Sequence, residues 1–163
     1  MRLLIIRHAT AVPRGTPGMP DDERHLTPEG EKKFRKAARG LARIQDRPDA
    51  LLSSPLPRAW RTALIAAEAW GEIAPKKTEA VIGAELEDLA PVLGQYAQDA
   101  TVAVVGHEPG LSALLARLLG TEEADRLAFK KGGTALVELP GPLAAGGSLV
   151  WFLPPRVLRN LAD

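Results

Sequence analysis

Two histidines and two arginines of this chain stand where they could do chemistry. The chain has three histidines, His8, His25 and His107. His8 follows Arg7 directly, and His107 lies in a Gly-His-Glu-Pro segment, each at the end of an apolar run. A further arginine, Arg58, comes shortly after a third apolar run. An imidazole can act as a nucleophile toward phosphorus, and guanidinium groups offer forked donors that suit phosphate or carboxylate oxygens. Together these residue types predict a site for phosphoryl transfer.

The composition excludes several other kinds of site. The 163 residues include no cysteine, which rules out a disulfide scaffold, a thiolate zinc site, an iron–sulfur cluster and a cysteine nucleophile. Three scattered histidines without an HxxxH-type spacing give no ligand set, so we expect neither a metal nor a cofactor. Twenty-one Lys and Arg against 20 Asp and Glu leave a net charge of +1, which favours neither nucleic acid nor a membrane as a partner.

Length and the amino-terminal pattern set the expectations for organisation. A chain of 163 residues fits one compact domain, so we expect residues 1–163 to form a single domain. The apolar run Leu3 to Ile6 is far shorter than the core of a signal peptide, and no stretch approaches the length of a transmembrane helix. We therefore expect a cytoplasmic location.

Short apolar runs predict the strands that must position these residues. Four such runs are Leu3 to Ile6, Ala50 to Ser53, Val102 to Val105 and Leu149 to Phe152. Three of them lack polar alternation, which indicates burial on both faces and a parallel sheet. Two further strands are expected at Ala80–Ile82 and Ala135–Leu139, and the glycine pairs at 132–133 and 146–147 bracket a final hairpin or edge pair.

Helical patterns lie between the strands. Apolar spacing predicts helices that begin near Pro28, Pro57 and Pro109, the first capped by Thr27 and the third ended by Gly120. A short helix is expected at the carboxyl end, and the proline- and glycine-rich segment 11–22 is expected to be an exposed loop. Strands that alternate with helices indicate the α/β class, as a three-layer α/β/α sandwich with a mostly parallel central sheet.

The candidate residues fall at one edge of this sheet. In open α/β sheets, ligands bind outside the carboxyl ends of the strands. His8, Arg58 and His107 each follow a different predicted strand, so we expect them to lie close together. The turn after His107 leads into a helix, whose free backbone N–H groups and positive dipole end favour an anion. Positive donors around a phosphoryl group in transfer lower the barrier to its reaction.

The surrounding motifs resemble those of the histidine phosphatase superfamily, the phosphoglycerate mutase-like proteins. Three motifs match in chain order: Leu4 to Ala9, Ser54 to Ala59 with Thr62 and Ala63, and Val105 to His107. The short chain and the segments Arg24 to Gly30 and Gly106 to Pro109 are most similar to the SixA branch, the phosphohistidine phosphatases. The resemblance covers nearly the whole chain and implies the phosphoglycerate mutase-like fold.

The resemblance also implies roles for individual residues. His8 is the nucleophile that becomes phosphorylated, and Arg7 and Arg58 hold the phosphoryl oxygens. His107 is the second histidine of the pocket and helps to hold the transition state. Arg24 matches an arginine of the branch that can reach the phosphate. Together with Glu85, a candidate general acid, these five residues make up the expected catalytic and substrate-binding set.

Ala9 departs from the family pattern. The family pattern also does not identify the general acid of this chain. The family usually has glycine after the first histidine, and alanine disfavours a positive φ, so we expect a small backbone adjustment at Ala9. Many members of the superfamily use a carboxylate to protonate the leaving group. Glu85 is the first candidate for this general acid, with Glu87 and Asp88 as alternatives. His25 has no comparable neighbours and is interpreted as a loop residue.

The leading hypothesis is a metal-independent phosphatase that acts through a phospho-His8 intermediate. Its substrate would be phosphohistidine on a protein of the histidine-phosphotransfer type, because so short a chain leaves little room for a segment that caps the pocket. One alternative is a phosphatase of small phosphate esters or metabolites. The alternative of another class is a phosphate-binding interaction module that has lost turnover. Mutase activity is disfavoured because it needs an enclosed pocket. A metal-dependent hydrolase is disfavoured because the three scattered histidines give no set of metal ligands.

Overall fold

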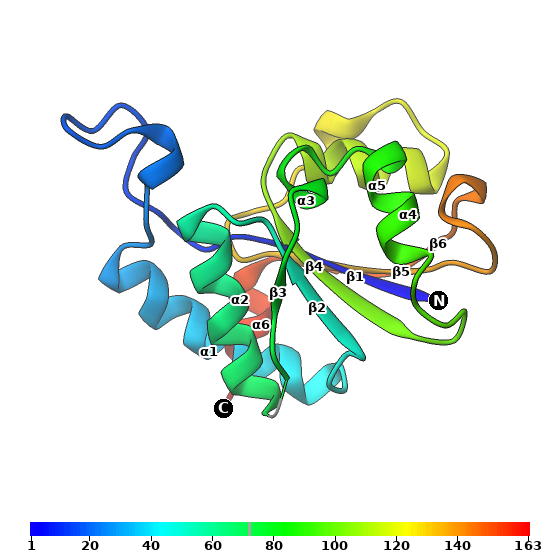
Figure 1. Ribbon diagram of the computed structural model, residues 1–163. Coiled ribbons are helices and arrows are strands. Elements are labelled where there is room, and N and C mark those ends of the chain that lie inside the picture. Colours follow the sequence, from blue (N-terminus) through cyan, green and yellow to red (C-terminus); the bar gives the residue numbers. More distant parts are fainter. Residues whose placement is uncertain (72) are drawn as a thin grey trace.

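A six-stranded sheet forms the middle of the molecule in the computed structural model, which describes residues 1–71 and 73–163. Its strand order is β3-β2-β4-β1-β5-β6 (Figure 1). The strands are β1 (Arg2–Arg7), β2 (Ala50–Ser53), β3 (Lys76–Lys77), β4 (Thr101–Gly106), β5 (Thr134–Glu138) and β6 (Ser148–Leu153). β1 to β4 are parallel, whereas β5 runs antiparallel to both β1 and β6. The sheet is thus mostly parallel, with the antiparallel edge pair that the glycine pairs predicted.

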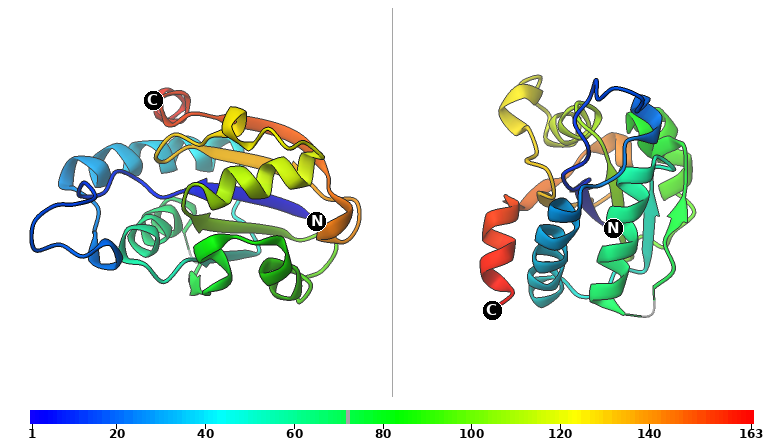
Figure 2. Two further views of the ribbon diagram at one scale, coloured as in Figure 1. Left: turned by 90° about the horizontal axis from the view of Figure 1, so that it is seen from above. Right: turned by 90° about the vertical axis from the view of Figure 1, so that its left-hand side faces the viewer.

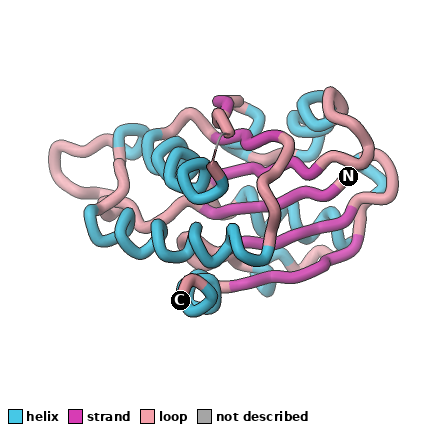
Figure 3. The backbone as a smooth tube through the Cα atoms, turned by 90° about the horizontal axis from the view of Figure 1, so that it is seen from below, coloured by secondary structure: helices cyan, strands magenta, loops and turns pink. Residues whose placement is uncertain are grey.

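Helices cover both faces of the sheet. One face carries α1 (Pro28–Ile44), α2 (Pro57–Trp70) and α6 (Pro155–Leu161), and the other carries α3 (Ala80–Gly83), α4 (Leu86–Leu93) and α5 (Gly110–Leu119) (Figures 1 and 2). Figure 3 shows the first group in front of the strands when the molecule is seen from below. Within the described residues, three short 3-10 helices lie in the connections: η1 (Asp21–Glu23), η2 (Ala124–Leu127) and η3 (Leu143–Ala145). The predicted three-layer α/β/α sandwich is confirmed.

Burial on both faces explains the unbroken apolar run of β1. Successive side chains of a strand point to opposite faces, so Leu3 and Ile5 join the core under α3, α4 and α5. Leu4 and Ile6 join the core under α1, α2 and α6. All four side chains are fully buried. A strand covered by helices on both faces has no place for a polar residue until it ends, which is where Arg7 and His8 begin.

The predicted signals at the helix ends are present in the structure. The Thr27 side chain accepts a hydrogen bond from the Gly30 N–H at 2.9 Å, and Pro28 is the first residue of α1. Gly120 ends α5 in the left-handed conformation, with a φ of 71°. A Cβ atom at Gly30 would clash with the carbonyl oxygen of Thr10. Glycine at this position therefore lets the backbone that follows His8 rest on the first turn of α1.

The strand expected at Ala80–Ile82 is wrong, because this segment forms the short helix α3. The strand at that edge of the sheet is β3, just before it in the chain. Three apolar residues in a row fit a strand or a buried helical turn equally well, and periodicity cannot separate them. The helix α4 was also not predicted; it buries Leu86, Leu89 and Leu93 at helical spacing.

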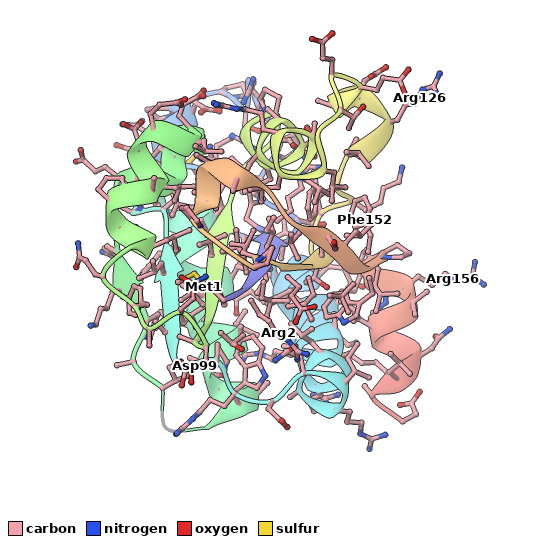
Figure 4. The ribbon with its side chains drawn as sticks, turned by 90° about the vertical axis from the view of Figure 1, so that its right-hand side faces the viewer. Met1, Arg2, Asp99, Arg126, Phe152 and Arg156 are labelled. Atoms are coloured by element: carbon pink, nitrogen blue, oxygen red, sulfur yellow. The ribbon has the colours of Figure 1, made fainter. Side chains whose placement is uncertain are left out.

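The amino end of β1 lies at the opposite edge of the sheet from His8. There the amino group of Met1 donates hydrogen bonds to the carbonyl oxygens of Gln98 and Leu139. Figure 4 shows this side of the molecule, with Met1, Arg2 and Asp99 labelled. In the described part of the chain, no helix is both long enough and apolar enough to span a membrane.

Candidate active site

The register of two neighbouring strands brings the two histidines together. Arg7 of β1 is the register partner of Gly106 of β4, so His8 and His107 leave the sheet at the same level. The backbone N–H of His8 donates to the carbonyl oxygen of Gly106 at 3.0 Å. The two imidazole rings lie 5.2 Å apart between centroids, with their planes inclined by 54°. Both residues are more than nine-tenths buried, at 5% and 7% exposure.

A backbone carbonyl sets the orientation and the tautomer of His8. Its Nδ1 lies 2.7 Å from the carbonyl oxygen of Ala9. Because a carbonyl oxygen can only accept, Nδ1 carries the hydrogen, and Nε2 of the neutral ring keeps its lone pair. The same backbone is anchored from α2, where the Thr62 hydroxyl accepts from the Ala9 N–H at 3.0 Å and donates to the Arg58 carbonyl at 2.7 Å.

Alanine replaces the usual glycine without backbone strain. Ala9 does not have a positive φ, so its methyl group meets no conformational penalty. The residue is buried in the core between the sheet and the helices α1 and α2. The expected backbone adjustment is therefore not needed to accommodate the side chain.

Burial keeps both histidines of the pair neutral. Removal from water, together with the nearby charges of Arg58 and Arg7, lowers the pKa of His8 to about 3. Burial likewise lowers the pKa of His107 to about 4, helped by the charge of Arg58 and opposed by that of Asp21. A neutral His8 at ordinary pH has the lone pair that a nucleophile requires.

His107 is held by the segment that follows β2. Its Nε2 lies 2.7 Å from the Ser54 hydroxyl, and this hydroxyl also accepts from the Leu56 N–H at 3.2 Å. The contact is possible because β2 is the neighbour of β4, with Ser53 beside Val105. Nδ1 of His107 is buried and has no hydrogen-bond partner in the described part of the chain.

The charges of Arg7 and Arg58 act on both histidines. Arg58, the second residue of α2, is almost fully buried and donates from Nη1 to the carbonyl oxygen of Asp21 at 2.8 Å. Arg7 donates from Nη1 to the carbonyl oxygen of Phe129, whose ring packs 4.7 Å from that of Phe152 on β6 (labelled in Figure 4). Removal from water lowers the pKa of both guanidinium groups.

Three side chains close to His8 each bury a polar nitrogen atom. The Nε atoms of Arg7 and Arg58 are buried and, like Nδ1 of His107, have no partner among residues 1–71 and 73–163. A buried donor without an acceptor costs about 1–3 kcal/mol, so a cluster of them needs an explanation. An anion with several oxygens has the acceptors that these guanidinium groups lack, and Nδ1 of His107 is a further donor when it carries the hydrogen of the ring. The tetrahedral phosphoryl group has that number of acceptors and the required negative charge.

Glu108 fixes the neighbourhood of Arg7. Its carboxylate accepts from the Phe129 N–H at 2.6 Å and from the Ser112 N–H at 3.0 Å. The charge of Glu108 raises the pKa of Arg7 against the effect of burial. The sequence predicted free N–H groups at the start of α5. In the structure the Ser112 N–H donates to the Glu108 carboxylate, and the Leu111 N–H donates to the His107 carbonyl. Two of the N–H groups at the start of α5 are therefore already paired within the protein.

The structure places Arg24 beside the cluster, together with an aspartate that sequence reasoning missed. Arg24 is buried, and its charge lowers the pKa of both His107 and Arg58. Its Nε lies 3.0 Å from a carboxylate oxygen of Asp21, which also contacts Arg58. The signal for Asp21 in the sequence is its position three residues before Arg24, a spacing that permits an ion pair within one turn.

The structure describes no hydrogen bond or ion pair between the remaining candidates and the histidine pair. Glu85 is exposed at the start of α4, and the structure describes no hydrogen bond or ion pair between it and the clustered residues. Glu87 pairs with Arg117 at 2.9 Å on the surface, and Asp88 is exposed. His25 is an exposed loop residue whose Nδ1 lies 2.9 Å from the Leu26 carbonyl. No three His, Asp or Glu side chains in the described ranges group as metal ligands.

Comparisons with known proteins match most of the chain. A family model, "Histidine phosphatase superfamily (branch 1)", matches residues 3–90. An uncharacterized protein of Picosynechococcus sp. is 30% identical over 141 residues, which cover 82% of this chain and 82% of the relative. The crystal structure of the proposed phosphohistidine phosphatase SixA from Agrobacterium tumefaciens is 26% identical, with a TM-score of 0.77 over 94% of this chain and 97% of that one. A structure of the protein histidine phosphatase SixA with tungstate has a TM-score of 0.81 at 23% identity, over 97% and 99% of the chains, and supports the fold.

Proposed function

The chain belongs to the histidine phosphatase superfamily, and on that premise we propose that it removes phosphate from phosphohistidine on a protein. The observation that carries the proposal is the buried pair of His8 and His107, with Nε2 of His8 free to attack and unpaired donors around it. The family membership and the fold support phosphatase activity in general.

The first step forms a covalent bond between His8 and phosphorus. Nε2 of His8 attacks the phosphoryl group in line with the leaving nitrogen, and the bond from phosphorus to that nitrogen breaks. The electron pair stays on the leaving imidazole, which takes up a proton. The hydrogen bond from Nδ1 to the Ala9 carbonyl stabilises the positive charge that His8 acquires, because the bond is stronger to a cationic donor.

The guanidinium groups and His107 hold the phosphoryl oxygens during transfer. Arg7 and Arg58 each present an unpaired Nε, and their side chains are positioned by backbone carbonyls. When the Ser54 hydroxyl donates to Nε2 of His107, the ring carries its hydrogen on Nδ1, which then becomes the third donor. Donors held in place before the reaction stabilise the charge of the transition state without reorganising.

The second step regenerates the enzyme. A water molecule attacks phosphorus, the bond between phosphorus and Nε2 of His8 breaks, and inorganic phosphate leaves. The proton released by the water balances the proton taken up by the leaving group in the first step. We propose Glu85 as the residue that exchanges this proton from the solvent side, because its side chain is exposed. It also lies two residues after Gly83, whose backbone packs closely against Gly110 at the start of α5.

The similarity to a SixA protein over nearly the whole of both chains supports a protein-borne substrate. The alignment with the Agrobacterium SixA protein spans 94% of this chain and 97% of that one, so the pair share a fold without a large added segment. A phosphohistidine on a protein surface offers a small ring that can enter between loops. We also propose that residues 1–163 work as one domain and that the protein acts in the cytoplasm.

Trapping of the intermediate tests the mechanism. Wild-type protein is mixed with radiolabelled substrate for a single turnover and quenched under alkaline conditions that preserve phosphohistidine. We expect label on the wild type and none on His8→Ala, with His25→Ala as the matched control that keeps the label. Label that persists on His8→Ala would refute the covalent role of His8.

A comparison of substrates tests the substrate class. The ratio kcat/KM is measured on a phosphorylated histidine-phosphotransfer domain and on a panel of phosphate esters, including p-nitrophenyl phosphate. We expect the protein substrate to be preferred. Preference for an ester of a metabolite would instead assign a small-molecule phosphatase, and absence of hydrolysis on every substrate would assign a phosphate-binding module.

A further inference from the structure

One carboxylate lies among three arginines next to the proposed phosphate site. Asp21 belongs to η1, in the long connection between β1 and α1 that stands out at the upper left of Figure 1. Its Oδ1 lies 3.1 Å from Nε of Arg14 and 3.0 Å from Nε of Arg24, and its Oδ2 lies 3.5 Å from Nη2 of Arg58. Its backbone carbonyl also accepts from Nη1 of Arg58.

The exposure of these side chains shows on which side of the site the carboxylate lies. The side chains of Arg58 and Arg24 are only 5% and 10% exposed, whereas that of Asp21 is 50% exposed. Asp21 therefore occupies the solvent side of the buried arginines. It is also close enough to His107 for its charge to act on that ring, against the effect of burial on the pKa.

We infer that Asp21 selects substrates by the charge of the leaving group and disfavours phosphate esters whose leaving group is an anion. The inference rests on the proposed phosphatase function and deepens it. The phosphoryl oxygens take the inner donors, namely Nε of Arg7, Nε of Arg58 and Nδ1 of His107. The leaving group must then extend toward solvent, past the half-exposed carboxylate of Asp21.

Electrostatics gives the direction and the size of the effect. Two like charges about 6 Å apart that are both well exposed to water repel enough to change an equilibrium by about three- to tenfold. A neutral leaving group such as an imidazole escapes this repulsion, whereas a carboxylate on the leaving group does not. Without the charge of Asp21, Arg14 and Arg24 would lose their counter-charge and would attract such a carboxylate.

The matched substrates are glycerol 3-phosphate and 3-phosphoglycerate. Both are phosphate esters of a primary alcohol on a three-carbon chain, but glycerol leaves as a neutral molecule and glycerate as an anion. The variant is Asp21→Asn, which keeps an oxygen that can accept from Arg24 and keeps the backbone carbonyl that accepts from Arg58. Glu23→Gln is the control, because Glu23 is exposed in the same turn and has the same charge.

We expect Asp21→Asn to raise kcat/KM for 3-phosphoglycerate relative to glycerol 3-phosphate by about three- to tenfold. Glu23→Gln should leave this ratio within about twofold of the wild type, and added salt should reduce the effect of Asp21→Asn. A residue that only holds the arginines in place would change both substrates equally. An unchanged ratio in Asp21→Asn, with or without a loss of overall activity, would overturn the inference.

A binding measurement separates this inference from the proposed function. Dissociation constants of the two esters are measured by calorimetry on the wild type and on Asp21→Asn, which requires no turnover. Failure to hydrolyse any phosphate compound would contradict the proposed function but would leave the ratio of dissociation constants to be read. We expect that ratio to shift in favour of 3-phosphoglycerate in the variant, and a constant ratio would refute selection by charge.

Discussion

The hydroxyl of Thr62 joins the backbone of the proposed nucleophile to the helix that carries Arg58. It accepts from the Ala9 N–H at 3.0 Å and donates to the Arg58 carbonyl at 2.7 Å, in a fully buried position. Thr62→Val replaces this hydroxyl with a methyl group of nearly the same size. The substitution therefore removes two hydrogen bonds and leaves the shape of the side chain almost unchanged.

The cost of this substitution follows from the groups that lose their partner. The Arg58 carbonyl still accepts the N–H of its own helix, but the Ala9 N–H is left buried without an acceptor. An orphaned buried donor costs about 1–3 kcal/mol, and we expect the free energy of unfolding to fall by about that amount. The carbonyl group of Ala9 orients the His8 ring. If the backbone at Ala9 shifts by about 1 Å when its N–H loses the acceptor, kcat/KM should fall by up to about a hundredfold.

Thr62→Ser is the matched control, because it keeps the hydroxyl and removes only a buried methyl group. We expect it to lose about 1 kcal/mol of stability and to keep kcat/KM within about twofold of the wild type. Stability is measured by urea denaturation, and activity is measured with p-nitrophenyl phosphate. Equal activity of Thr62→Val and Thr62→Ser would refute the idea that this hydroxyl positions the nucleophile.

Three other perturbations address the charges of the site. The folded-state pKa values of about 3 for His8 and about 4 for His107 lie below the ordinary value of 6.5, so only the unfolded chain binds these protons as the pH falls. The free energy of unfolding should therefore decrease from pH 6.5 toward pH 4.5, by up to about 1.4 kcal/mol per pH unit for each group, and a flat profile in urea denaturation would contradict this. Glu108→Gln places an amide where two backbone N–H groups converge, and it removes the negative charge that faces Arg7. We expect kcat/KM to fall about tenfold. Wild-type activity in this variant would show that Glu108 does not position Arg7. Glu85→Gln should slow poor leaving groups such as alkyl phosphates by about tenfold and barely affect p-nitrophenyl phosphate, and an equal effect on both would argue against a general acid.

Local patterns were sufficient for most of the elements. The unbroken apolar run before Arg7 predicted a strand buried on both faces, and the Thr27 cap with Pro28 predicted the start of α1. Such signals depend on neighbours a few residues apart, which is why they can be recognised in a sequence. The same reasoning failed at Ala80–Ile82, where three apolar residues fit two structures and only packing against β4 and α5 selects the helix.

The histidine pair was predictable because parallel strands end at one edge of a sheet. Residues that follow neighbouring strands must lie near each other there, and this rule brought His8 and His107 together without knowledge of the loops. The rule does not extend to Glu85, which comes after a misassigned strand and has no described hydrogen bond or ion pair with the cluster. Its role therefore stays a prediction that the proposed leaving-group experiment tests.

The sequence by itself determined the layers of the fold, the strand ends and the residue types that could transfer a phosphoryl group. Only the tertiary structure decided which polar atoms meet: Asp21 with Arg58, Glu108 with the Phe129 N–H, and Thr62 with the Ala9 N–H. These partners are 21 to 53 residues apart in the chain. No local periodicity encodes such contacts, because they arise when separate helices and loops pack on a common sheet and each buried polar group must find a partner there.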